Sequence, residues 1–297
     1  SDLIVSWCKA CSHFTSLVLD EADYQLPELS PLIRLPPQIT QRLRGELSKE
    51  DLLARIAELP SHKAPGPDQI THEMLKAAPD ALIDIILAAI NQALTSLESL
   101  PTLFKEGICC MLYKKGAPES AANYRPIVLL NVIYKLLTAV ITFRLNAILE
   151  KYGILDSRQE GFRQKRSTGR QVQSIMWERD QARDSRARLI QAFIDFCNAF
   201  NSIDHPAVWT LGKGTLMPDM DLLQNIYDGT YYKTSTPYGL TANIVLTRGT
   251  KQGDGLSPLL FIFLFNALLA MLRRRKARNA ETIASALVRA FADDLTI

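Results

Sequence analysis

The sequence predicts an α+β fold, with helices and strands mixed along one globular chain. Apolar residues recur at helical spacing in two segments, residues 79–97 and 133–149. Shorter apolar runs at residues 107–115, 189–194 and 287–291 have the length and bulk of strands. No internal repeat or low-complexity tract is present, so we expect continuous globular structure rather than a repeat array.

The composition fits a globular core but does not by itself indicate a partner. The 297 residues are 47% hydrophobic, enough for a core and one or two domains. With 34 basic and 31 acidic residues the net charge is only +3, so any binding of nucleic acid must come from local basic patches. Five cysteines form no disulfide framework and no secretory leader opens the sequence, so we expect an intracellular protein.

The first half of the sequence is expected to be mainly helical. Residues 1–60 resemble an N-terminal extension with one short helix, which Ser48 and Asp51 can cap and which Pro60 ends. A strand at 107–115 and a charged helix at about 168–186 are also expected. The helix at 79–97 should bury one face, made of Leu82, Ile86, Ile90, Ala93 and Leu97.

In the second half, two strand-like runs end at acidic residues. Asp195 follows the run at 189–194, and Asp293 and Asp294 follow the run at 287–291. A third strand, at 244–246, leads into a glycine-containing loop at 248–255. The apolar run from Leu256 to Leu272 comes next, and because it contains serine, proline and asparagine we interpret it as a buried helix rather than a membrane span.

Acids at the tips of buried strands suit metal-assisted phosphoryl transfer. A buried strand is a rigid support, and its last side chain can reach into a cleft. Two such tips side by side can hold two ions, and hard carboxylate ligands suit Mg²⁺. Taken singly, Asp195 is equally explained as a helix cap, and Asp293 with Asp294 as a solvated turn.

Six stretches taken together resemble the reverse transcriptases of non-LTR, LINE-like retrotransposons, over about residues 61–297. They are APGPD at 64–68, NYRPIVLLN at 123–131, QEGFRQKRST at 159–168, and the segments AFIDFCNAFNSIDH, RGTKQGDGLSPLLF and AFADDL around Asp195, Gln252 and Asp293. The resemblance implies a polymerase right-hand fold with fingers at 61–188 and a truncated palm at 189–297, without a thumb. It implies RNA-templated addition of dNTPs to a DNA primer, and a nuclear location.

The resemblance also implies a role for each matching residue. Asp195 and Asp293 would be the principal Mg²⁺ ligands, with support from Asp294 and the Phe196 carbonyl. Lys114 and Arg125 would grip the triphosphate, although spacing alone leaves Lys115 open in place of Lys114. Phe200 would be a wall beneath the sugar that excludes a ribose 2′-hydroxyl, and its alternative is core packing. Gln252 and Gly253 would contact the nascent base pair.

Two basic clusters and one cysteine pair have open interpretations. The first basic cluster, Arg158, Arg163, Lys165, Arg166 and Arg170, lies in the family's template-handling region. There we expect Gly161, Arg163, Lys165 and Arg166 to contact nucleic acid, whereas a solvated face is the alternative. Residues 273–278 form a second basic cluster, for which nucleic-acid contact and a solvated face are both open. Cys8, Cys11 and His13 have a metal-like spacing but no partner pair, so chance is the better explanation.

The sequence departs from the family pattern at a few positions, and these leave alternatives open. Asn198 and Asn201 replace a common lysine and aspartate, Gly255 replaces proline and Phe291 replaces tyrosine. Asn201 could reflect decay of a once-active copy. The alternatives are a group II intron maturase-type enzyme and an inactive RNA-binding remnant. We also expect the isolated 297-residue piece to be inactive, because too few residues follow Asp294 to complete a returning strand.

Overall fold

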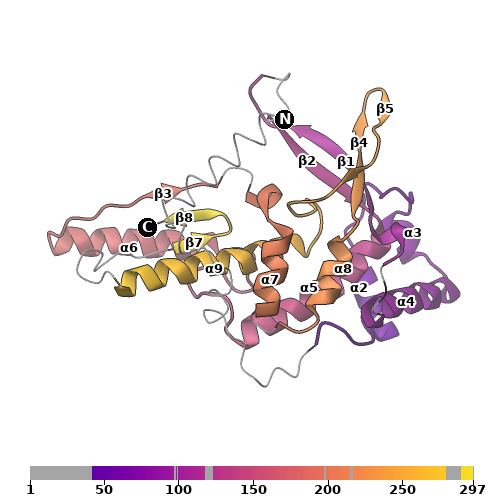
Figure 1. Cartoon of the computed structure of the whole chain (residues 1–297), viewed down its shortest axis with the longest axis horizontal. Coiled ribbons are helices and arrows are strands. Elements are labelled where there is room, and N and C mark those ends of the chain that lie inside the picture. Colours follow the sequence, from indigo (N-terminus) through magenta and orange to yellow (C-terminus); the bar gives the residue numbers. More distant parts are fainter. Residues whose placement is uncertain are drawn as a thin grey trace.

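The computed structural model describes residues 42–96, 98, 100–117, 123–196, 199–214, 217–278 and 289–296. Its helices and strands alternate irregularly along the chain, as the α+β prediction requires (Figure 1). Cys8, Cys11 and His13, with Asn198 and Leu287, lie outside the described residues, as do the side chains of the second basic cluster.

The larger sheet joins strands from both halves of the sequence. β1 (Glu106–Tyr113) pairs antiparallel with β2 (Tyr124–Leu130) and parallel with β4 (Tyr231–Thr236). β5 (Gly239–Leu240) and β6 (Ile244–Val245) both pair antiparallel with β4. The predicted fingers and palm regions therefore share one sheet, and the boundary between them at residue 188 stays a prediction.

The smaller sheet carries the acidic residues. β3 (Phe193–Ile194), β8 (Asp294–Thr296) and β7 (Arg289–Phe291) form an antiparallel sheet with β8 in the middle. The expectation that too few residues follow Asp294 for a returning strand was wrong. β8 is short, but it pairs on both of its edges, so three residues are sufficient.

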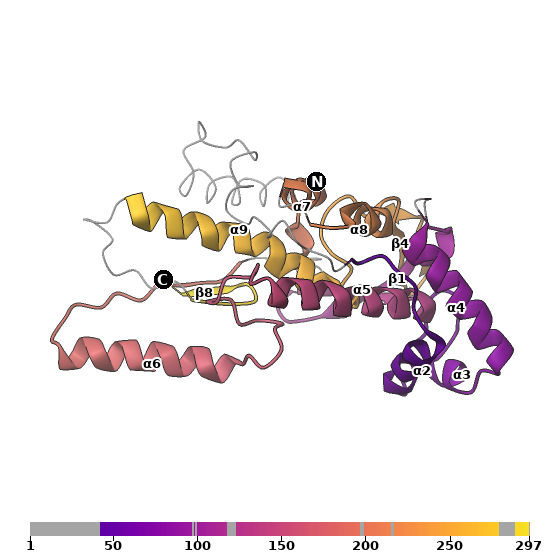
Figure 2. The same ribbon diagram turned by 90° about the horizontal axis from the view of Figure 1, so that it is seen from below.

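Different helices lie beside each of the two sheets. α2 (Lys49–Glu58), α3 (His72–Lys76) and α4 (Asp80–Thr95) lie beside the base of the larger sheet (Figure 1). α6 (Thr168–Asp184) lies beside the hairpin of β7 and β8 (Figure 2). Glu178 on α6 forms an ion pair with Arg289 on β7. Two further helices follow the smaller sheet's first strand, α7 (His205–Gly214) and α8 (Met220–Tyr227).

The core is built around α5 (Val132–Lys151), which packs against α4, and against α9 (Ser257–Arg278) on another side. By length and composition alone α5 is apolar enough to cross a membrane. Ten of its residues are buried inside the fold, so packing accounts for that apolarity. The part of the predicted extension from residue 42 onward also belongs to this core, since Leu43 and Leu52 are fully buried.

Most predicted elements are present with small shifts. α2 is capped by the Ser48 side chain, which accepts a hydrogen bond from the Asp51 backbone at 3.1 Å, as predicted. On α4 the inward face is shifted, because Ile83 is buried and Leu82 is exposed. The run at 189–194 is not a buried strand: only two of its residues are in β3, and Ile190 and Phe193 are 83% and 71% exposed.

Candidate active site

A cleft of about 710 Å³ lies between the two sheets, and eight residues singled out from the sequence line it. They come from the β1–β2 hairpin, the ends of the smaller sheet, a short 3-10 helix and the loop before α9: Lys114, Arg125, Asp195, Phe196, Phe200, Gln252, Gly253 and Asp293. Asp294 is the one predicted active-site acid that is not among the lining residues, because it begins β8 and is exposed. Segments more than 170 positions apart in the sequence thus meet at one site.

The acids meet because β3 and β8 are neighbours. Ile194 lies opposite Leu295, so the same register continued by one residue sets Asp195 across from Asp294. Asp293 occupies the turn of the β7–β8 hairpin. Burial raises the pKa of the Asp293 carboxyl, and the negative charges of Asp294 and Asp195 raise it further. Asp293 is therefore close enough to Asp195 and Asp294 to be affected by their negative charges, and a bound cation would offset them.

The donor set fits Mg²⁺ held partly by substrate. Within the described part of the chain no three His, Cys, Asp or Glu side chains converge as a complete metal cage. Mg²⁺ commonly takes one or two carboxylates and fills its other positions with water and substrate phosphates. Asp195 and Asp293, both open to the cleft, match this pattern.

The basic side of the cleft is the outer end of the β1–β2 hairpin. Arg125 pairs in register with Leu112, and the Lys114 backbone donates to the Asn123 carbonyl at 2.7 Å. Both side chains line the main cleft and also a neighbouring pocket of about 450 Å³. Lys115 lines only the neighbouring pocket, so the geometry favours Lys114 as the lysine that reaches into the main cleft.

The Gln252–Gly253 loop is fastened to the edge of β2. The Gln252 carbonyl accepts a hydrogen bond from the Val128 backbone at 2.8 Å. Gly253 has φ +123°, and a Cβ there would lie 2.7 Å from the Val128 carbonyl oxygen. Glycine is required here both by conformation and by space.

Asn201 holds the Gln252 side chain, a contact that the sequence did not reveal. The Gln252 amide nitrogen donates to Asn201 Oδ1 at 3.1 Å. An aspartate at this position could accept the same bond, so replacing it with asparagine keeps the contact and removes one negative charge from the cleft. The contact with Gln252 therefore does not require an aspartate at position 201.

Phe200 lies in η5 (Ala199–Ser202), within a short aromatic stack. Its ring is stacked on Phe261 at a centroid distance of 4.7 Å and meets Phe162 edge-on at 5.8 Å. The ring also lines the cleft and is only partly buried. Core packing thus fixes its position on one side and leaves its other side toward the cleft.

A buried polar group supports the Gln252 loop from behind, and sequence reasoning missed it. Lys251 is 2% exposed, and its Nζ donates to Tyr134 Oη at 2.9 Å and to the Ile226 carbonyl at 3.3 Å. Tyr134 Oη in turn donates to Asp254 at 2.9 Å. Burial lowers the pKa of Lys251 to about 7, although the Asp254 charge opposes the shift. The only hint of this buried group in the sequence was the motif KQGD, in which a lysine and an aspartate flank Gln252 and Gly253.

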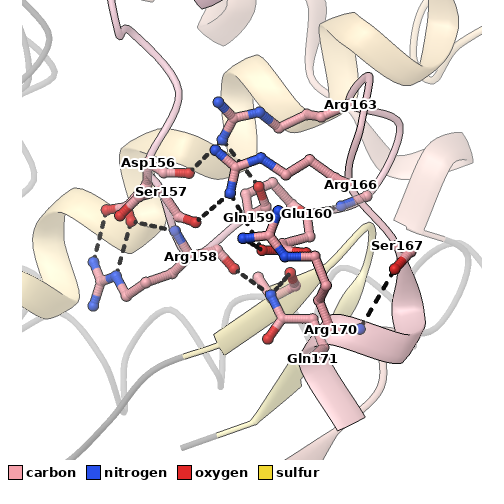
Figure 3. A network of polar contacts seen from close by, with 12 residues as sticks. Asp156, Ser157, Arg158, Gln159, Glu160, Arg163, Arg166, Ser167, Arg170 and Gln171 are labelled. Atoms are coloured by element: carbon pink, nitrogen blue, oxygen red, sulfur yellow. Dashed lines mark hydrogen bonds and ion pairs between the residues drawn. The ribbon is translucent and has the colours of Figure 1, made fainter. Parts of the chain in front are cut away.

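Most side chains of the first basic cluster form hydrogen bonds or ion pairs within the protein (Figure 3). Arg163 is buried, pairs with Glu150 through two nitrogens at 2.7 Å, and donates to two backbone carbonyls. Gly161 is also buried, where a Cβ would lie 2.1 Å from the Ala292 backbone nitrogen. The structure therefore corrects the predicted nucleic-acid contact for these two residues: both are structural.

The other basic side chains of the cluster differ in whether they are free to contact a phosphate of nucleic acid. Arg166 pairs with Glu160 at 3.2 Å and Arg158 pairs with Asp156 at 2.7 Å (Figure 3). Lys165 is exposed and has no hydrogen bond or ion pair among the described residues. Of the four predicted contacts, Lys165 is the best placed to meet a phosphate, and Arg166 would have to share its charge with Glu160.

Comparison with known proteins defines the class. The family of reverse transcriptases (RNA-dependent DNA polymerases) matches residues 112–297, more than half of the chain, and the chain therefore belongs to this family. This result confirms the resemblance drawn from the sequence and is consistent with the α+β polymerase fold.

Individual relatives are polymerases of mobile elements. A probable RNA-directed DNA polymerase from transposon BS of Drosophila melanogaster is 31% identical over 84% of this chain and 27% of its own length. The corresponding protein of the X-element, from the same organism, is 33% identical over 69% of this chain and 23% of its own length. The Pol polyprotein of the retrotransposable element R2DM is 28% identical over 86% of this chain and 24% of its own length. The chain spans about a quarter of the length of these relatives.

Proposed function

We propose that this chain carries the catalytic centre of an RNA-directed DNA polymerase of a non-LTR retrotransposon, which adds dNTPs to a primer 3′-end on an RNA template. Residues 61–188 would form the fingers and residues 189–297 a part of the palm. The observation that supports this most directly is that Asp195 and Asp293 line the same cleft as Lys114 and Arg125. Nucleotidyl transfer needs both kinds of side chain, because the carboxylates hold the metal ions and the basic side chains hold the triphosphate.

The proposed Mg²⁺ ligands are Asp195 and Asp293, with Asp294 and the Phe196 carbonyl in support. When bound, Mg²⁺ would make the primer hydroxyl a better nucleophile and neutralise charge on the triphosphate. Asp195 and Asp293 would orient these ions from two neighbouring strand ends. The sites are thus built on sheet rather than on a free loop, which favours precise placement.

The remaining lining residues would position the nucleotide. Lys114 would contact the phosphates as a point charge and Arg125 as a planar fork. Phe200 would lie beneath the sugar, held by Phe261, while Gln252 and Gly253 would approach the new base pair. Lys165 would contact the template strand. By family resemblance we place this activity in the nucleus.

The test is magnesium-dependent extension of a DNA primer on RNA, measured with this chain in its full reading frame. Asp195→Asn and Asp293→Asn should each reduce extension by about three orders of magnitude, because ion charge stabilises the transferring phosphoryl group. Asp184→Asn, an exposed acid at the end of α6, is the matched control and should extend normally.

Two outcomes would contradict the proposal. Near-normal extension by either cleft variant would remove Asp195 or Asp293 from the reaction. Retained RNA binding without any extension by the unaltered protein would favour the inactive RNA-binding remnant instead. A maturase-type enzyme is the alternative within the same class, and the transposon relatives do not favour it.

A further inference from the structure

The segment between α5 and α6 is built onto the hairpin that carries Asp293. The Ala290 backbone donates to the Arg158 carbonyl at 3.0 Å, and the Glu160 backbone donates to the Ala290 carbonyl at 3.0 Å. Gln159 and Ala290 form a parallel bridge, so residues 158–160 act as an added edge beside β7. This edge brings the Gln159 side chain to the turn of the hairpin.

The carboxamide of Gln159 holds both backbone polar groups of one residue in that turn. Its oxygen accepts from the Ala292 N–H at 2.9 Å, and its nitrogen donates to the Ala292 carbonyl at 3.0 Å. The oxygen also accepts from the Gly161 N–H at 2.8 Å. Gln159 is fully buried, so no solvent competes for these bonds. Figure 3 shows the side chain within the polar network beside the hairpin.

Ala292 needs such support because of its conformation. It has φ +55°, in the left-handed region that residues other than glycine rarely adopt. Gly161 lies so close that a Cβ there would be 2.1 Å from the Ala292 nitrogen. The turn is thus held from one side by backbone contact and by the Gln159 amide, immediately before Asp293.

We propose that Gln159 is a positioning residue for Asp293: its side-chain amide fixes the Ala292 peptide units and so sets where the Asp293 carboxylate points. The inference rests on the proposed function, in which Asp293 holds a divalent cation. Gln159 itself does not line the cleft, so any effect that it has on metal binding would be indirect. Substituting a residue that orients a metal ligand, without binding the metal itself, typically lowers metal affinity by about 10-fold to 100-fold.

Gln171 provides a matched control in the same network. It is also a buried glutamine, and its amide nitrogen donates to the Arg158 carbonyl at 3.0 Å and to the Ala290 carbonyl at 3.3 Å. It therefore binds the same hairpin, but two residues before Ala292. Gln159→Met and Gln171→Met each remove buried hydrogen bonds to this hairpin with little change in volume.

The experiment measures Mn²⁺ binding to the 297-residue chain by electron paramagnetic resonance, with urea unfolding of each variant for comparison. Asp293→Asn defines the signal that belongs to the cleft. Gln159→Met should weaken the Asp293-dependent Mn²⁺ affinity by about 10-fold. Gln171→Met should change it less than twofold while losing comparable stability. If Gln159→Met does not fold, Gln159→Asn tests the same point, because its shorter amide cannot reach both Ala292 groups.

The outcomes separate this inference from the proposed function. If Asp293→Asn leaves Mn²⁺ binding unchanged, the metal site of the proposed function fails, and the role of Gln159 fails with it. If Asp293→Asn abolishes binding but Gln159→Met retains wild-type affinity, only the positioning role fails. An equal loss of affinity in Gln159→Met and Gln171→Met would also overturn it, because a general loosening of the hairpin would then suffice.

Discussion

Replacing Lys251 with methionine should flatten the rise in stability of this chain between pH 7 and about pH 10. In the folded chain Lys251 Nζ lies 4.1 Å from the ring centroid of Tyr134 and 5.3 Å from that of Tyr227. Burial lowers its pKa from 10.5 to about 7. Methionine is unbranched and of similar length, so it can fill the same space without the charge.

The sign follows from proton binding. Between about pH 7 and pH 10.5 the unfolded chain binds a proton at Lys251 that the folded chain does not bind. Raising the pH in this window therefore stabilises the fold, by about 1.4 kcal/mol per pH unit. The full difference between the two pKa values corresponds to about 5 kcal/mol. The interval from pH 7 to pH 9 corresponds to about 2 kcal/mol, because Lys251 of the folded chain is still half protonated at pH 7.

Urea unfolding followed by circular dichroism at pH 6, 7, 8 and 9 measures this difference. Burial holds the pKa values of Tyr134 and Tyr227 well above 10, so these phenols stay protonated throughout the window. Lys151→Met is the control, since Lys151 is exposed and also lies over a tyrosine ring. Wild type and Lys151→Met should gain stability relative to Lys251→Met as the pH rises. Parallel curves for all three proteins would refute the lowered pKa of Lys251.

Three further predictions concern the cleft and are measured by primer extension. Phe200→Val should raise the ratio of ribonucleotide to deoxynucleotide incorporation by about 10-fold or more, because the discrimination would be steric; if both rates fall together, Phe200 only packs against Phe261. Asn201→Asp should keep extension within about threefold of wild type and Asn201→Leu should raise the KM for dNTP about 10-fold, since only the former can accept the Gln252 bond; equal effects would rule out that contact. Gly253→Ala should reduce extension by about 10-fold or more, because its Cβ would press on the Val128 carbonyl; normal extension would show that the loop can shift freely.

The sequence predicted the elements with strong local signals and missed those that depend on distant partners. The Ser48 cap and the apolar face of α5 are local patterns, and both are present. β4 was not predicted, since YYKTST has no clear alternation and its place is set by pairing with β1. The error over the run at 189–194 has a related cause, because hydrophobicity alone does not show whether other elements cover a strand.

The candidate site was accessible from the sequence because its residues lie in recognisable motifs. Those motifs name the lining residues but not what supports them. Gln159 lies in one motif and acts on the turn beside another, and Lys251 reaches Tyr134 on a helix more than a hundred positions away. Such contacts follow from the fold, so spacing along the chain cannot reveal them. In the case of Arg163 the motif suggested a surface charge, and only the structure shows its partner Glu150.

The pairing of β1 with β4 limits how the cleft can close. β1 is bonded to β4 only from Glu106 to Cys109, whereas its pairing with β2 continues to Tyr113. The base of the β1–β2 hairpin is therefore held in a sheet that also contains β4, from the second half of the chain. Beyond Cys109 the hairpin consists of two paired strands, and Met111, Leu112 and Tyr113 of β1 are exposed. Lys114 and Arg125 lie at the free end of this hairpin. Any movement of Lys114 and Arg125 toward Asp195 would therefore require the hairpin to bend beyond Cys109, where β4 no longer supports it.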